Sequence, residues 1–140
     1  MEDTRDFKIS MEINQNQARV IKDALELYSR LQMGQIKEID LFFRLRSKER
    51  MDYDRNMMDH LLETIKRMYF PDLSSNGFYG IFGDKTPEEA KIAWDLIQNM
   101  RYTISWKIHP EGGMGVNFDS PLKSSNEEFP TVKIIPECPE

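Results

Sequence analysis

The sequence predicts an α+β fold, a single domain of three main helices with a small antiparallel sheet. Along three long stretches, apolar residues recur at intervals of three and four, the period of a helix with one buried face. Elsewhere apolar and polar residues alternate, as in a strand with one buried face. A length of 140 residues suits one core. We therefore assign residues 1–140 to one domain, with flexible ends at 1–5 and 136–140.

The chain is expected to open with a β-strand over residues 6–13, where Phe7, Ile9, Met11 and Ile13 alternate with polar residues. A helical segment follows over residues 14–46. Asn14 is a good N-cap, and Gln17, three residues on, completes a capping box. The expected core stripe consists of Ala18, Ile21, Ala24, Leu25, Tyr28 and Leu31. Gly34 either kinks this segment or breaks it into two helices.

Two features predict a homo-oligomer. Beyond Gly34, the apolar residues between Ile36 and Leu45 form a surface too broad for one exposed helix face, which implies a partner surface. A second long helix is expected over Ser47–Phe70, with Ser47 as its cap and Pro71 as its stop. Such a helix spans about 33 Å, more than a compact domain of this size needs.

The third helix has the clearest expected start. Thr86 is the expected N-cap, Pro87 occupies the first helical position, and Glu88 and Glu89 lie in the first turn, where the helix dipole favours acids. Its apolar stripe continues to about Lys107. Short strands are expected at 115–118 and 131–135, around a polar loop at 119–130, and residues 78–82 are a strand or an extended edge.

Composition excludes several classes of function. Lys and Arg number 19 and Asp and Glu 24, a net charge of −5 that repels duplex nucleic acid and anionic membranes. A small phosphorylated ligand stays possible, because a few local arginines or amides can hold phosphate. Cys138 is the one cysteine, so no intramolecular disulfide is expected. With no apolar run of about 18 residues and no signal peptide, we expect a cytoplasmic protein.

No residues suggest catalysis, a metal or a cofactor. Neither His60 nor His109 has a catalytic companion, so each is expected to be structural or at the surface. Asp52 and Asp54 lie two apart on the expected helix and face different directions. No serine occupies a strand-to-helix elbow. We therefore expect no catalytic residue, no metal site, no cofactor and no enzymatic activity.

One stretch indicates more than packing, the glycine-rich segment Gly112–Pro121. Glycines let the backbone approach a ligand closely, and on an extended strand Asn117 and Asp119 lie on the same side, opposite Phe118. An amide and a carboxylate in this arrangement suit a base or a ribose. The same residues also fit a purely structural turn that leads into a strand.

Three segments together resemble small bacteriophage proteins: ALELYSRLQMGQ, TPEEAKIAWDLIQNMRYTISW and GGMGVNFDSP. Over most of residues 11–121 the chain is similar to the first Thoeris anti-defence family. These are phage sponges that bind cyclic ADP-ribose signals without degrading them. Other phage sponges of cyclic nucleotides are close competitors. In the family the ligand sits at a subunit interface, with an aromatic ring on adenine, Asn and Asp on ribose, and arginines on the phosphates.

The resemblance implies roles for individual residues. Asn117 and Asp119 match the Asn-x-Asp element, while Tyr28 and Arg30 fall near the family's helix contacts. The stacking ring comes from one of two aromatic residues. The candidates for it are Phe82 and Trp106. At the C-terminus this chain departs from the family, because only Lys123 or Lys133 stands where the family has a phosphate-binding arginine.

The function implied by this resemblance is sequestration of a cyclic nucleotide immune signal in the host cytoplasm by a phage-encoded homo-oligomer. A sponge needs affinity alone, which stacking and charge-assisted contacts supply. The alternative is a small acidic phage protein that inhibits a host enzyme by direct contact through a methionine-bearing surface. A third possibility, an enzyme that cleaves the nucleotide, has less support from the sequence.

Overall fold

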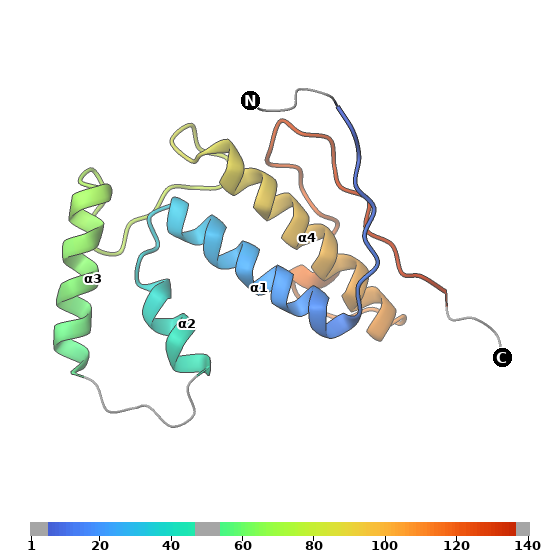
Figure 1. Cartoon of the computed structure of the whole chain (residues 1–140), viewed down its shortest axis with the longest axis horizontal. Helices are drawn as coiled ribbons and strands as arrows, with labels where there is room; N and C mark the ends of the chain where they lie inside the picture. Colours follow the sequence, from blue (N-terminus) through green and yellow to red (C-terminus); the bar gives the residue numbers. More distant parts are fainter. Residues whose placement is uncertain (1–5, 47–53, 137–140) are drawn as a thin grey trace.

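The computed structural model describes residues 6–46 and 54–136. They form four α-helices, α1 (Gln15–Gln32), α2 (Glu38–Arg46), α3 (Arg55–Tyr69) and α4 (Glu88–Ile108), and a short 3-10 helix, η1 (Val116–Phe118) (Figure 1). These ranges contain no β-strand. The predicted α+β fold with an antiparallel sheet is therefore wrong, and the described chain is all-helical.

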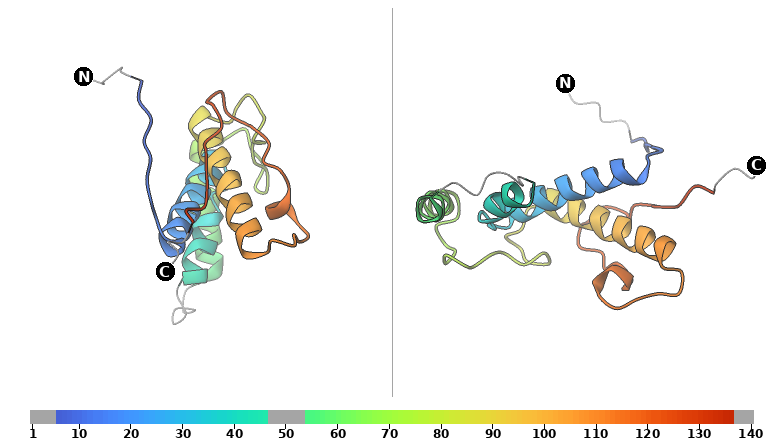
Figure 2. Two further views of the ribbon diagram at one scale, coloured as in Figure 1. Left: turned by 90° about the vertical axis from the view of Figure 1, so that its right-hand side faces the viewer. Right: turned by 90° about the horizontal axis from the view of Figure 1, so that it is seen from below.

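The core lies between α1 and α4, which pack side by side in opposite directions (Figures 1 and 2). Ser29, near the end of α1, donates a hydrogen bond of 2.9 Å to the carbonyl oxygen of Ala90 at the start of α4. The buried apolar side chains along this contact include small residues that let the two backbones approach. The small residues are Ala18, Ala90 and Ala93, and the larger buried side chains are Ile97 and Met100.

Local signals fix both ends of α1. The predicted capping box is confirmed, because the Gln17 amide donates to Asn14 Oδ1 over 2.9 Å and the Asn14 amide donates to Gln17 Oε1 over 3.0 Å. At the other end Gly34 has φ = +91°, a conformation that L-residues with a side chain rarely adopt. A Cβ at Gly34 would also collide with Leu73 Cδ1. Gly34 therefore breaks the segment into α1 and α2.

The predicted strands fail because a strand needs a neighbour for its backbone hydrogen bonds, and period-two alternation does not supply one. Residues 6–13 carry exposed side chains throughout, including Phe7, Ile9 and Met11. Lys8 in this segment forms an exposed ion pair of 3.1 Å with Glu128. Residues 115–118 turn into η1, and 78–82 and 131–135 are irregular.

Helix α3 stands at one end of the molecule, beyond α2 (Figure 1). Its N-cap is Asp54, whose Oδ1 accepts from the Met57 amide over 3.1 Å. The predicted Ser47 cap and residues 47–53 lie outside the described residues. On its inner side the buried Lys66 ammonium donates to the carbonyl oxygens of Ser75 (2.9 Å) and Gly77 (2.6 Å), and burial lowers the pKa of Lys66. These bonds attach α3 to the following loop.

The start of α4 differs in detail from the prediction. Pro87 is the N-cap and makes no side-chain capping bond. The Thr86 hydroxyl instead donates to the carbonyl oxygen of Gly80 over 2.5 Å, so Thr86 is not the cap. The predicted end near Lys107 is confirmed, since α4 ends at Ile108.

A buried carboxylate fastens the later part of the chain to α4. Asp95 Oδ1 accepts from the amide and hydroxyl of Ser124, each over 2.8 Å. Asp95 Oδ2 accepts from the amide (3.0 Å) and hydroxyl (2.6 Å) of Ser125. Burial by itself would raise the pKa of Asp95, but the four hydrogen bonds hold it below its ordinary value. The chain after η1 is thereby held against the middle of α4.

Candidate functional site

An aromatic cluster forms where the end of α4 meets η1. The rings of Trp106 and Phe118 pack edge to face, with centroids 5.5 Å apart at 80°. The Trp106 indole Nε1 donates to the carbonyl oxygen of Phe118 over 3.3 Å. Tyr102 adds a second edge contact to Trp106 at 6.3 Å. The indole nevertheless stays partly exposed.

The glycines of this segment serve the cluster. A Cβ at Gly113 would lie 2.6 Å from Phe118 Cε2, and one at Gly112 would lie 3.1 Å from Trp106 Cη2. Both positions therefore let the backbone pass close to an aromatic ring. Beyond them Met114 is fully exposed. The backbone at Gly112 and Gly113 therefore approaches the rings of Trp106 and Phe118, and not a ligand as the sequence suggested.

Asn117 and Asp119 flank Phe118 and are both exposed. The expectation that they share one side of a strand is wrong, because Asn117 lies in η1 and Asp119 is its C-cap. A 3-10 helix has three residues per turn, so positions two apart point in different directions. Neither side chain makes a hydrogen bond with any other residue in the described ranges. Both therefore present free polar groups beside a partly exposed indole.

The predicted helix residues lie elsewhere. Tyr28 is exposed on α1, and Phe82 is exposed in the loop that precedes α4. Arg30 is engaged within the chain: its guanidinium contacts Glu26 at 3.0 Å, Gln35 at 2.9 Å and Glu38 at 3.7 Å. These partners use the donors that a phosphate would need.

Sequence reasoning missed an arginine–tryptophan cluster on α4. The guanidinium carbons of Arg30 and Arg101 lie 5.9 Å and 5.7 Å from the centroid of the Trp94 ring, within the range of a cation–π contact. The Nε atom of Arg101 is buried and has no hydrogen-bond partner among the described residues. The spacing of seven between Trp94 and Arg101 was a signal for this contact, since residues two turns apart share a helix face.

The six predicted site residues therefore fall into two groups. Tyr28, Arg30 and Phe82 lie on the side of the start of α4, whereas Trp106, Asn117 and Asp119 lie at its end. Trp94, beside Arg30, and Trp106 are twelve residues apart, which is about 18 Å along a helix. Within one chain the two groups do not enclose a common ligand.

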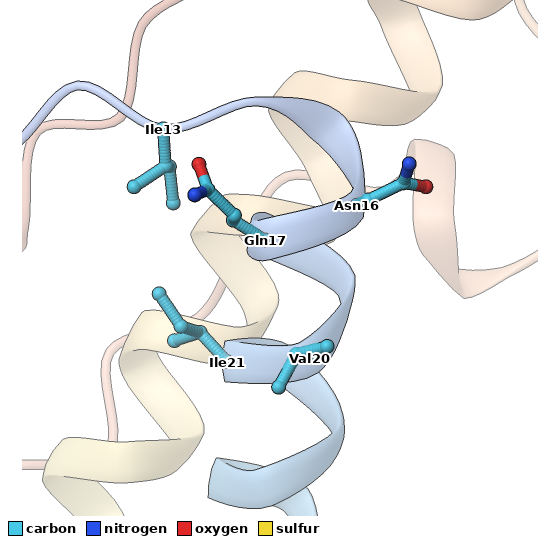
Figure 3. Close-up of a pocket in the computed structure, with 5 residues that line it drawn as sticks. All are labelled: Ile13, Asn16, Gln17, Val20 and Ile21. Atoms are coloured by element: carbon cyan, nitrogen blue, oxygen red, sulfur yellow. The ribbon is translucent and has the colours of Figure 1, made fainter.

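None of the six predicted site residues lines either of two depressions in the surface. One, of 480 Å³, is lined by Ile13, Asn16, Gln17, Val20 and Ile21 at the start of α1 (Figure 3). In this view Ile13, Gln17 and Ile21 line one side and Asn16 points away. A second, of 220 Å³, lies between the start of α2 and the loop at 75–78, and includes Lys37 and Lys66.

The described part of the chain has neither a cluster of metal-binding side chains nor a helix that could span a membrane. No group of three His, Cys, Asp or Glu residues is placed to hold a metal ion. None of the described helices is both long and apolar enough to cross a membrane. Compared with protein families, curated proteins and solved structures, the chain matches none.

Proposed function

We propose that this protein is a phage-encoded sponge that binds a cyclic nucleotide immune signal of the cyclic ADP-ribose type and sequesters it in the host cytoplasm. The observation that supports it is the partly exposed Trp106 indole beside Asn117 and Asp119, whose side chains make no hydrogen bond within residues 6–46 and 54–136. An aromatic face stacks on adenine, and an amide and a carboxylate hydrogen-bond to ribose hydroxyls.

In this proposal the protein is a homo-oligomer, and the ligand binds between subunits. Tyr28, Arg30 and Phe82 lie toward the start of α4, and Trp94, which Arg30 contacts, is about 18 Å along the helix from Trp106. In this proposal the two groups therefore reach one ligand from different chains. Arg30 would have to exchange its contacts with Glu26 and Glu38 for phosphate. Arg101 is an additional candidate for phosphate, because its Nε has no partner in the described ranges.

Sequestration requires no bond to be broken. At high copy number, binding alone lowers the free concentration of a signal, so the protein is proposed to release its ligand unchanged. Stacking and charge-assisted hydrogen bonds to phosphate provide the affinity.

The second candidate function is inhibition of a host enzyme by direct protein contact. The observation that favours it is the exposed apolar surface of α3, which includes Met57 and Met68 on an acidic chain. Methionine side chains adapt to varied partner surfaces. This function needs no nucleotide, and so the two candidates differ in a simple experiment.

The experiment is incubation of the purified protein with a panel of cyclic nucleotides, followed by removal of free ligand, heat release and chromatography. Recovery of an unchanged cyclic nucleotide supports the sponge. Recovery of an altered nucleotide indicates an enzyme. If no nucleotide is retained, the sponge proposal fails and inhibition of a host enzyme takes its place.

A further inference from the structure

One face of α3 carries an apolar stripe that the described part of the chain leaves exposed. Its four side chains remain exposed to 61% (Met57), 51% (Leu61), 37% (Ile65) and 71% (Met68). Their spacing of four, four and three residues places them on one face of the helix. We refer to these four residues as the α3 stripe.

The rest of the chain approaches α3 from another side. Leu62 and Lys66 are the buried residues of this helix, and the Lys66 ammonium bonds to the loop that follows it. At 100° per residue, Leu62 and Lys66 lie about 100° or more around the helix from Leu61. The α3 stripe therefore lies on another side of the helix from these buried residues, and α3 itself stands at one end of the molecule (Figure 1).

We infer that the α3 stripe is a dimerisation surface, on which α3 of one chain packs antiparallel against α3 of a second copy. The inference goes beyond the proposed function and needs no ligand. Because α3 and the end of α4 lie at opposite ends of the molecule (Figure 1), this contact is separate from the one that the proposed ligand site needs.

The spacing of the stripe favours a second copy as the occupant. When two such helices run antiparallel about a two-fold axis between Leu61 and Ile65, Met57 meets Met68 of the other copy and Leu61 meets Ile65. An isologous interface needs this kind of self-complementarity, because the same patch serves both chains. The stripe has a methionine at each end and two branched aliphatic residues in the middle, so it has the same order of residue types in either direction.

Charge does not oppose this contact. Met58, His60 and Thr64 lie beside the stripe and carry no permanent charge. The nearest charged residues are Asp54, the N-cap one turn before Met57, and Arg67, which forms an ion pair with Glu63. Burying the stripe therefore strands no ion pair. The charged residues of α3 are of both signs: Arg55, Lys66 and Arg67 against Asp59 and Glu63. The net charge of α3 is therefore small, and electrostatic repulsion between two copies of the helix is weak.

A membrane surface is a poorer occupant. Helices that lie on anionic membranes carry an excess of Lys and Arg on their polar face. Helix α3 has nearly balanced charge, and the chain as a whole carries −5, so an anionic surface repels it.

The size of the stripe sets the expected strength. From Met57 to Met68 it extends about 17 Å and is one helix wide, which is less than the roughly 800 Å² per partner of a standard stable interface. We therefore expect a dimer that dissociates on dilution through the micromolar range rather than a permanent one.

Sedimentation of the full chain without ligand, from about 1 to about 500 µM, tests the inference. We expect the mass to rise to twice the 16.6 kDa of one chain. Leu61→Glu should keep the mass of one chain at the highest concentration, with unchanged circular dichroism. The matched control Val20→Glu changes an exposed residue of α1 and should still dimerise. Should Leu61→Glu lose helicity, the more exposed Met68→Glu takes its place.

Cross-linking tests the direction of packing. In a Cys138→Ser background, oxidation of a mixture of Met57→Cys and Met68→Cys chains should give a mixed disulfide, and either chain alone should give little. Efficient cross-linking of each variant with itself would overturn the antiparallel arrangement. If Leu61→Glu still dimerises, the α3 stripe is not the dimer interface and the inference is overturned, although the chain remains a dimer. A wild type that stays a monomer would also remove the oligomer from the proposed function, while calorimetry with a cyclic nucleotide tests the ligand separately.

Discussion

The indole Nε1 of Trp106 donates a hydrogen bond to the carbonyl oxygen of Phe118, and the two rings pack edge to face. This pair joins the end of α4 to η1 across a turn of eleven intervening residues. It fixes the position of Asn117 and Asp119 relative to the indole, because both are immediate neighbours of Phe118. The pair is therefore structural and also orients the polar groups of the proposed ligand site.

The buried carboxylate of Asp95 should be a major contributor to stability. Asp95→Ala removes the acceptor of four hydrogen bonds and leaves the buried Ser125 donors without a partner. We expect the free energy of unfolding to fall by about 3 kcal/mol or more. Urea denaturation measures this change. The control is Asp84→Ala, at an exposed aspartate of the loop before α4, which should change the free energy by less than about 0.5 kcal/mol. Equal midpoints for the two variants would contradict the role of Asp95.

The same carboxylate predicts a dependence of stability on pH. The pKa of Asp95 is lower in the folded chain than its ordinary value, so the stability it contributes is present above about pH 4 and is lost as the pH falls through the folded pKa. Asp95→Asn lacks this ionisation. We expect the difference in urea midpoint between wild type and Asp95→Asn to narrow from pH 6 to pH 2. A difference that stays constant over this range would contradict the prediction.

Asp72 should titrate at unusually low pH. Hydrogen bonds from Lys85 Nζ (2.8 Å) and the Tyr79 hydroxyl lower the pKa of its carboxyl to about 2. Because the folded pKa is depressed, this carboxyl favours the folded state above about pH 4 and loses that effect toward pH 2. Carboxyl carbon NMR measures the pKa directly. In Lys85→Met we expect it to rise toward the ordinary value, and no change would show that the two side chains do not meet in solution.

The Thr86 hydroxyl should stabilise the loop before α4 rather than cap the helix. Thr86→Val removes the bond to the Gly80 carbonyl and should cost about 1 kcal/mol of the free energy of unfolding. Thr86→Ser keeps the hydroxyl and should cost less. If serine and valine are equally destabilising in urea, the methyl group and not the hydroxyl carries the effect.

Local chemistry explains what could be predicted from the sequence. The capping box of Asn14 and Gln17 and the break at Gly34 depend on neighbours within a few residues, and such signals are visible in a chain read by itself. The extent of α4 followed from its apolar period and from Pro87 at its start.

The errors concern contacts between distant residues. The alternation at residues 6–13 indicated an extended chain but could not show that a pairing strand is absent from the described ranges. Thr86 matched a cap signature, but its hydroxyl bonds to Gly80 in the preceding loop. The bonds from Asp95 to Ser125 span thirty residues, and no local pattern announces them. The separation of the predicted site residues into two groups also depends on packing between distant segments, and so it could not be predicted from local patterns.

Calorimetry with a cyclic adenine nucleotide of the cyclic ADP-ribose type tests the central proposal most directly, on wild type, Asn117→Ala/Asp119→Ala and the control Asp84→Ala. Each lost hydrogen-bonding group should weaken binding by roughly 5-fold to 150-fold, equivalent to about 1 to 3 kcal/mol, so the double variant should lose most binding. Circular dichroism and the urea midpoint should stay unchanged, because neither side chain bonds to another described residue. We predict saturable binding by wild type and control and little by the double variant. Equal binding by all three proteins, or no binding by the wild type, would contradict the proposed function.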